Sequence, residues 1–112
     1  MKIHWTRVAN QNLKHIEKYL SQENPIAAID TILSIIQTVE LLKQQPVMGR
    51  AGRVLNTREL IISGTPYIAP YRIKNKIIEI IRVFHSSMKW VDDVEGEEAC
   101  FKAVRIEHKI KK

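Results

Sequence analysis

The chain has 112 residues, 45 % of them hydrophobic, and a formal net charge of +6 from 18 Lys and Arg against 12 Asp and Glu. That length holds one domain, the apolar fraction argues against disorder, and a single cysteine, Cys100, excludes an internal disulfide or a multi-thiolate metal site. The longest apolar patches, around Ile61 and residues 77–78, are too short for a membrane span and no secretion signal precedes them, so we expect a cytoplasmic protein without a membrane partner.

The first predicted element is a short half-buried strand over residues 2–6, because Ile3 and Trp5 alternate with polar residues. Apolar residues then recur at spacings of four, three and four, which predicts an amphipathic helix of about four turns. The residues of this stripe are Ala9, Leu13, Ile16 and Leu20.

A second helix is predicted to begin at Asn24 and Pro25, because asparagine caps helices and proline is tolerated in the first turn. Its apolar stripe is Ile29, Ile32, Ile36 and Val39, and Pro46 is expected to close it. Two amphipathic helices with a short connection form an antiparallel hairpin, which needs a surface to cover.

That surface is predicted to be a three-stranded antiparallel meander. Residues 45–56 form an irregular loop, and stretches rich in β-branched residues follow at 58–62, 67–73 and 77–84, separated by turns at 63–66 and 74–76. The third stretch is apolar on both faces except at Glu79 and Arg82, which favours a central strand. Pro70 predicts a bulge or an exposed edge in the second strand.

The last residues are expected to lie outside this domain. Residues 91–96 are typical of a linker, and 97–110 carry apolar residues at helical spacing, although Phe101, Val104 and Ile106 also fit a strand. The expected fold class is therefore α+β: an N-terminal strand, a two-helix hairpin and a meander in a domain of residues 1–90, with a helical extension over 91–112.

The positive charge is concentrated in the middle of the chain. Residues 50–90 hold 8 basic and 2 acidic residues, whereas residues 1–49 hold 5 and 4, and residues 91–112 hold 5 and 6. Guanidinium groups make planar, bidentate contacts with phosphate and carboxylate, so the cluster indicates an anionic partner. A basic surface that only keeps the protein soluble is the alternative. Five of the eight cations are arginines: Arg50, Arg53, Arg58, Arg72 and Arg82.

Several strings in this segment resemble the RelE/ParE superfamily of bacterial toxins, and most closely its ParE-type branch. They are the Pro-x-x-Gly-Arg loop at 46–50, RELIISGTPYIAPYRI at 58–73, and IIEIIRVFHSSMKW at 77–90. The resemblance covers roughly residues 1–90. It implies the toxin of a type II toxin–antitoxin system, in which a cognate antitoxin holds the toxin silent. RelE-type members cleave messenger RNA in the ribosome, while ParE-type members poison DNA gyrase.

Both targets occur among proteins of this one fold, so the fold does not identify the target. The target must be inferred from the side chains of the site. In a nuclease, Arg82 would hold the scissile phosphate, His85 would act as acid or base, and Glu59 would be the base. RelE-like nucleases usually place a functional tyrosine at this strand end, whereas here Ser86 follows His85 and the aromatic residue is Trp90. We therefore favour a non-enzymatic gyrase poison without a cofactor; the alternative is a ribosome-dependent mRNA endonuclease.

Each candidate residue also has a structural explanation. If Ile73 pairs with Ile77, Arg72 and Arg82 share a face and form an anion site; a shift of one residue pairs Arg72 with Glu79 instead. Glu59 could balance Arg58 or Arg72, His85 could bond to backbone, and Trp90 could cover the core. Arg50 and Arg53, on a glycine-bearing loop, have the least structural explanation and are expected to touch a partner.

The residues expected to bind the target or antitoxin are Arg50, Arg53, Arg58, Arg72, Arg82, His85 and Trp90. No metal site is expected, because the four histidines, His4, His15, His85 and His108, are scattered singly.

Overall fold

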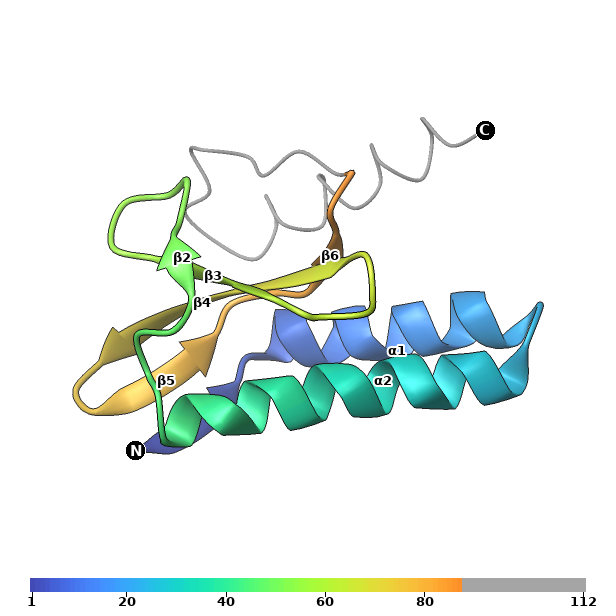
Figure 1. Ribbon diagram of the computed structural model, residues 1–112, viewed down its shortest axis with the longest axis horizontal. Helices are drawn as coiled ribbons and strands as arrows, with labels where there is room; N and C mark the ends of the chain where they lie inside the picture. The colour runs from blue at the N-terminus through green and yellow to red at the C-terminus, as the bar shows by residue number, and fades with distance from the viewer. Residues whose placement is uncertain (88–112) are drawn as a thin grey trace.

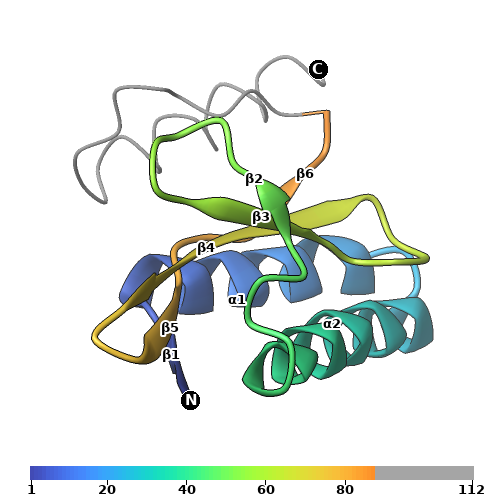
Figure 2. The same ribbon diagram turned by 60° about the vertical axis from the view of Figure 1, so that its left-hand side comes forward.

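The computed structural model describes residues 1–87, in which two helices pack against one face of a six-stranded sheet (Figures 1 and 2). The predicted helix over 97–110 and the predicted boundary at residue 90 lie outside these residues. The elements in chain order are β1 (Lys2–Trp5), α1 (Arg7–Ser21), α2 (Pro25–Glu40), the 3-10 turn η1 (Leu41–Lys43), β2 (Arg50–Ala51), β3 (Arg58–Ile61), β4 (Tyr67–Lys74), β5 (Ile77–Ile80) and β6 (Phe84–His85).

The second helix begins where the sequence predicts, and the first begins at Arg7 after a Thr6 cap that was not predicted. The Thr6 hydroxyl accepts a hydrogen bond from the Ala9 amide (3.2 Å), and the Asn24 side chain accepts one from the Ala27 amide (3.1 Å). The expected end of the second helix at Pro46 is wrong, because α2 ends at Glu40. There the chain tightens into η1, which buries Leu42 in the core.

The helical stretch Pro25–Lys43 has apolar residues on its exposed side as well as on its buried side. An 18-residue window within its 19 residues has a mean hydropathy of 1.5, so by length and composition it is the one stretch of the described residues that could cross a membrane, which was not expected from the sequence. The core helix of a soluble protein passes the same test, and α2 does bury Ala28 and Ile35. Its outward side nevertheless exposes Ile26, Ile29 and Leu33 by 73, 54 and 47 %.

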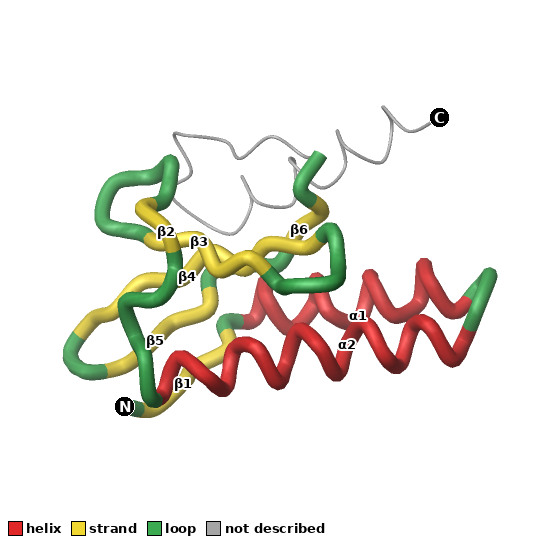
Figure 3. The backbone as a smooth tube through the Cα atoms, in the orientation of Figure 1, coloured by secondary structure: helices red, strands yellow, loops and turns green. Residues whose placement is uncertain are grey.

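The predicted meander is confirmed by antiparallel pairing of β3 with β4 and of β4 with β5. The sheet order is β1-β5-β4-β3-β2, so β5 is a central strand, as expected. Two strand contacts were not predicted. β1 pairs in parallel with β5, Lys2 opposite Ile77, and the short strand β2 lies within the expected loop and pairs with β3 (Figure 3).

The third predicted strand is interrupted by a bulge beside Pro70. Tyr71 pairs with Ile80 and Ile68 with Phe84, so two residues of β4 face three residues, 81–83, on the other side. The Pro70 carbonyl accepts from the Ile81 amide (2.9 Å). The expected bulge is therefore confirmed, with the extra residue on the neighbouring chain segment. The alternative, an exposed edge, is wrong, because Pro70 is buried inside the sheet.

The core fills the space between the helical hairpin and the sheet face it covers. Ile35 and Val39 of α2 pack there with Tyr71 of β4 and with Ile78 and Ile80 of β5, all fully buried. The core lies on one side of the sheet, and the loop that carries Arg50 and Arg53 lies outside it. The opposite face is also buried at Glu59, Ile68 and Pro70.

Candidate functional site

Tyr71 fixes the loop that carries the first arginines. Its hydroxyl donates to the Pro46 carbonyl (2.7 Å) and accepts from the Gly49 amide (3.0 Å). A Cβ on Gly49 would come within 2.6 Å of the Tyr71 ring, so the close approach requires glycine. The Pro-x-x-Gly-Arg string is thus a docking segment for a buried tyrosine, and it ends at Arg50 on β2.

Glu59 joins this loop to the sheet through an arrangement that we call the Glu59 clamp. Its carboxylate, 1 % exposed, accepts from the Arg50 side chain (3.0 Å), the Arg53 side chain (3.3 Å) and the Arg53 amide (3.1 Å). Arg58 and Arg72 were considered from the sequence as partners that could balance Glu59. The structure gives it Arg50 and Arg53 instead, because the β2–β3 pairing sets Arg50 directly opposite Glu59.

The clamp keeps Glu59 ionised. Burial alone raises the pKa of this carboxyl, but the hydrogen bonds from the Arg53 amide and the Arg50 side chain, with the charge of Arg53, outweigh burial and hold the pKa below its usual value. Arg50 and Arg53 therefore have the structural role that the sequence analysis did not expect. Their side chains remain 56 and 43 % exposed, so they can also touch a partner.

The register between β4 and β5 makes Arg72 part of an ion pair. Arg72 lies opposite Glu79, and its Nε donates to the Glu79 carboxylate over 2.6 Å. That hydrogen bond lowers the pKa of Glu79. Of the two registers left open by the sequence, the structure has the second, in which Arg72 and Arg82 do not form a joint anion site.

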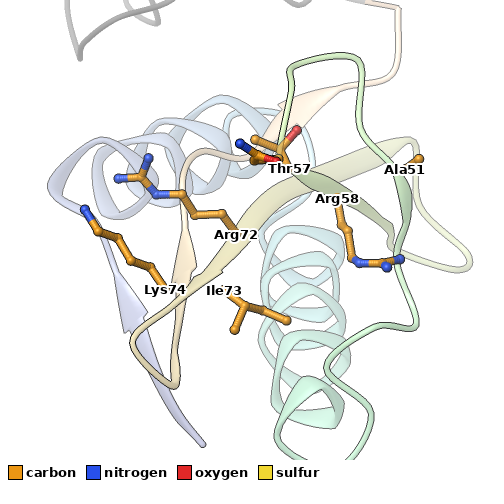
Figure 4. Close-up of a pocket in the computed structure, with 7 residues that line it drawn as sticks. Ala51, Thr57, Arg58, Arg72, Ile73 and Lys74 are labelled. Carbon is orange, nitrogen blue, oxygen red and sulfur yellow. The ribbon is translucent and has the colours of Figure 1, made fainter.

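A cationic hollow of about 580 Å³ opens at the end of β4, between that strand and the loop 51–57. We use this name for the space lined by Ala51, Asn56, Thr57, Arg58, Arg72, Ile73 and Lys74. Figure 4 shows Arg72 and Lys74 extending to one side of β4, with Arg58 and Ile73 on the other, as strand alternation requires. The residues that line the hollow include three cations and no carboxylate. One of these cations, Arg72, forms an ion pair with Glu79, which is not part of the lining.

Arg58 is held at the mouth of the hollow by backbone groups. Its Nη1 donates to the carbonyls of Gly49 (2.8 Å) and Val47 (3.2 Å). A guanidinium has five N–H donors, so these bonds leave Arg58 able to bind an anion in the hollow. Lys74 and Thr57 were not among the predicted site residues, because the sequence analysis assigned Lys74 to a turn and gave residue 57 no element.

The remaining predicted site residues lie elsewhere. Arg82 is in the bulge rather than on a strand and is fully buried, with its guanidinium 4.9 Å from the centre of the Phe84 ring. Phe84 also lies 6.0 Å from the Arg53 guanidinium. His85 is partly buried, and its ring meets the Tyr67 ring edge-on at 5.6 Å. Trp90 lies outside the described residues.

These positions do not favour the nuclease chemistry considered for the site. A base must take up a proton, but Glu59 has a lowered pKa and is already occupied by arginine donors. Buried Arg82 does not reach a phosphate in this conformation. The Nδ1 of His85 accepts from the Ser87 amide (3.1 Å), the backbone contact that its structural explanation predicts. Within residues 1–87, no group of three potential metal-ligating side chains gathers.

A helical hairpin that covers one face of such a sheet is the α+β arrangement that the resemblance to RelE/ParE toxins implies. The comparisons with known proteins agree. A sequence model described as the ParE toxin of the type II toxin–antitoxin system parDE matches residues 3–90. The chain therefore belongs to the ParE toxin family of type II toxin–antitoxin systems.

Individual relatives match about three quarters or more of the chain. "Putative toxin Y4kP" of Sinorhizobium fredii is 38 % identical over 89 residues, which are 80 % of this chain and 92 % of that protein. Toxin RelE2 of Caulobacter vibrioides is 29 % identical over 74 % of this chain and 92 % of its own length. A solved structure titled as the chromosomal ParDE system from P. aeruginosa has a TM-score of 0.70 and 32 % identity, covering 76 % of this chain and 95 % of that one.

Proposed function

We propose that this toxin arrests growth by poisoning DNA gyrase in the cytoplasm and that a cognate antitoxin neutralises it. The observation that carries the choice of target is the Glu59 clamp. Its carboxylate, the group best placed by sequence to act as the base of a nuclease, instead anchors Arg50 and Arg53. A toxin that works by binding rather than by proton transfer needs such a rigid basic surface and no catalytic base.

The antitoxin is proposed to cover apolar as well as basic surface. Ile26, Ile29 and Leu33 follow one another at spacings of three and four along α2, so they form a stripe that a partner helix can bury. The solved relative from P. aeruginosa is titled as a ParDE system, which supports a toxin of this family assembling with an antitoxin.

The target is tested by expressing the chain from a tightly repressed promoter and measuring the DNA-damage response, message cleavage and, with purified proteins, gyrase supercoiling. We expect DNA damage and loss of supercoiling before any message is cut. His85→Ala is the discriminating variant because His85 is only partly buried and could serve a nuclease. It should keep its toxicity if gyrase is the target.

His15→Ala, at an exposed position of α1, is the matched control for loss of a histidine. Messages cut within minutes, with normal supercoiling and a harmless His85→Ala variant, would assign the toxin to the ribosome-dependent mRNA endonucleases instead.

A further inference from the structure

The cationic hollow has a shape and a backbone edge suited to an extended segment. Successive residues of a strand point their backbone groups to opposite sides, and the Tyr67 carbonyl accepts from the Ile62 amide, so Tyr67, Ala69 and Tyr71 face β3. Ile73 is the next residue of this series. Because β3 begins at Arg58, opposite Tyr71, no strand residue within 1–87 faces Ile73 on that side. Its amide and carbonyl therefore point toward the hollow.

The turn of the chain at Asn56 creates this opening. Asn56 has a φ of 64°, and the Thr57 amide donates to the Val54 carbonyl (3.2 Å), so the loop bends away from β4 before β3 starts. A second extended segment can lie where β3 would otherwise have continued, between cations on either side of β4.

The chain itself supplies a segment of the opposite charge. Residues 91–98 contain no lysine or arginine, and five carboxylates stand within 92–98: Asp92, Asp93, Glu95, Glu97 and Glu98. This acidic segment follows the part of the chain that matches the ParE toxin family, which ends at residue 90. Its charge is opposite to that of the hollow, whose lining has three cations and no carboxylate.

The distances allow the two to meet. β6 pairs His85 with Tyr67, and the Ser86 amide donates to the Pro66 carbonyl, so the chain at Ser87 is about eight strand residues, roughly 26 Å, from Ile73. From Ser87, residue 95 is up to about 27 Å away along an extended chain and residue 98 up to about 38 Å. The second half of the acidic segment is therefore long enough to reach the hollow.

We propose that segment 92–98 occupies the cationic hollow of its own chain and pairs its carboxylates with Arg58, Arg72 and Lys74. The segment is then a tethered competitor for every anionic partner of the hollow. At a local concentration of about 1 mM and an intrinsic Kd of about 0.1 mM, it raises the apparent Kd of such a partner roughly tenfold.

Carbodiimide coupling of the full-length chain tests the contact, because it joins a lysine amine to a carboxylate only where the two groups touch. We expect an amide between Lys74 and a carboxylate of segment 92–98 at low salt, several-fold less of it at 1 M NaCl, and little coupling at Lys18 on α1. Isotope-labelled and unlabelled chains are mixed so that coupling within one chain is distinguished from coupling between chains. Coupling only between chains, or as often at Lys18 as at Lys74, overturns the proposal.

A binding measurement tests the consequence. The full chain with Asp92→Asn, Asp93→Asn, Glu95→Gln, Glu97→Gln and Glu98→Gln should bind a polyglutamate peptide roughly tenfold more tightly than the unmodified chain. Adding Arg72→Gln and Lys74→Gln should remove that gain. The control neutralises five carboxylates elsewhere, namely Glu17, Glu23, Asp30, Glu40 and Glu107.

If the control set tightens binding as much as the tail set, net charge is the cause and the docked segment is disproved. If the tail variant still binds polyglutamate more tightly after Arg72 and Lys74 are also replaced, the acidic segment binds to another surface. That result likewise overturns the proposal. If DNA of mixed sequence gains affinity where polyglutamate does not, the hollow takes a nucleic acid and not an acidic polypeptide.

Discussion

At the scale of single residues, the hydroxyl of Tyr71 connects the hydrophobic core to the loop that carries the arginines. It bonds both the Pro46 carbonyl and the Gly49 amide from a side chain that is otherwise fully buried. Tyr71→Phe keeps the ring but leaves the buried Gly49 amide without its acceptor. We expect a loss of about 1–3 kcal/mol in the free energy of unfolding, measured by urea denaturation.

If the Tyr71→Phe protein has the same unfolding free energy and the same urea dependence as the original, the role given to the Tyr71 hydroxyl is wrong. Gly49→Ala provides an independent check, because it should destabilise through the clash with the Tyr71 ring. The Tyr71→Phe background, which removes the hydroxyl but keeps the ring, should relieve little of that clash.

Glu59 makes the stability of the fold dependent on pH. Its pKa is lower in the folded protein than its ordinary value of 4.5, so its stabilising contribution is present above that value and is lost as the pH falls through the folded pKa. We expect the unfolding free energy to decrease below about pH 4.5 and to decrease less steeply for Glu59→Gln. Urea denaturation from pH 7 to pH 3 measures both slopes.

Glu17→Gln, at an exposed position of α1, is the control for loss of a carboxylate. Parallel pH profiles of Glu59→Gln and the unmodified chain would contradict the role given to the clamp. Glu79→Gln should have a smaller effect at neutral pH, since half-exposed ion pairs such as Arg72–Glu79 are worth less than about 1 kcal/mol.

At the scale of elements, the bulge at 81–83 depends on a side chain from the first helix. The Asn12 side chain, 5 % exposed, accepts a hydrogen bond from the Val83 amide (2.9 Å), which has left the strand ladder. Asn12→Ala leaves this buried amide unpaired, so we expect a loss of about 1–3 kcal/mol and faster hydrogen exchange at Val83. Asn10→Ala, at an exposed position of the same helix, should change neither.

The elements also show which features a single sequence can predict. Caps and periodicity locate α1 and the start of α2, because Asn24 and Pro25 act locally. The register of β4 and β5 depends on Asn75 and Lys76, whose φ values of 53° and 64° make a two-residue turn and set Lys74 opposite Ile77. The sequence analysis placed residues 74, 75 and 76 all in the turn, so the pairing of the residues on either side remained open.

The candidate site was harder to predict than the fold, because its partners are distant in sequence. The Glu59 clamp exists only because Arg50 and Ala51 add a strand of two residues, too short to give a pattern. The burial of Arg82 follows from an extra residue opposite Pro70, and no local signal states on which segment that residue falls. Charge clustering did identify Arg58 and Arg72, which line the hollow.

At the scale of the whole molecule, the exposed apolar stripe of α2 is expected to be the surface that an antitoxin buries. Ile29→Glu or Leu33→Glu places a charge on this stripe without entering the core, so the toxin should still fold and arrest growth. We expect binding of the cognate antitoxin to weaken roughly 10- to 100-fold, measured by titration calorimetry. Gln11→Glu on α1 is the control. Unchanged affinity in both stripe variants would place the antitoxin elsewhere.

The parallel contact of β1 with β5 has a consequence for how the toxin is made. The first strand to leave the ribosome finds its neighbour only some 75 residues later, where Lys2 meets Ile77 and the Thr6 hydroxyl bonds the Ile80 carbonyl. Contacts of such long sequence separation form slowly and cannot close on an incomplete chain. The sheet of the toxin is therefore completed only after residues 77–80 have left the ribosome.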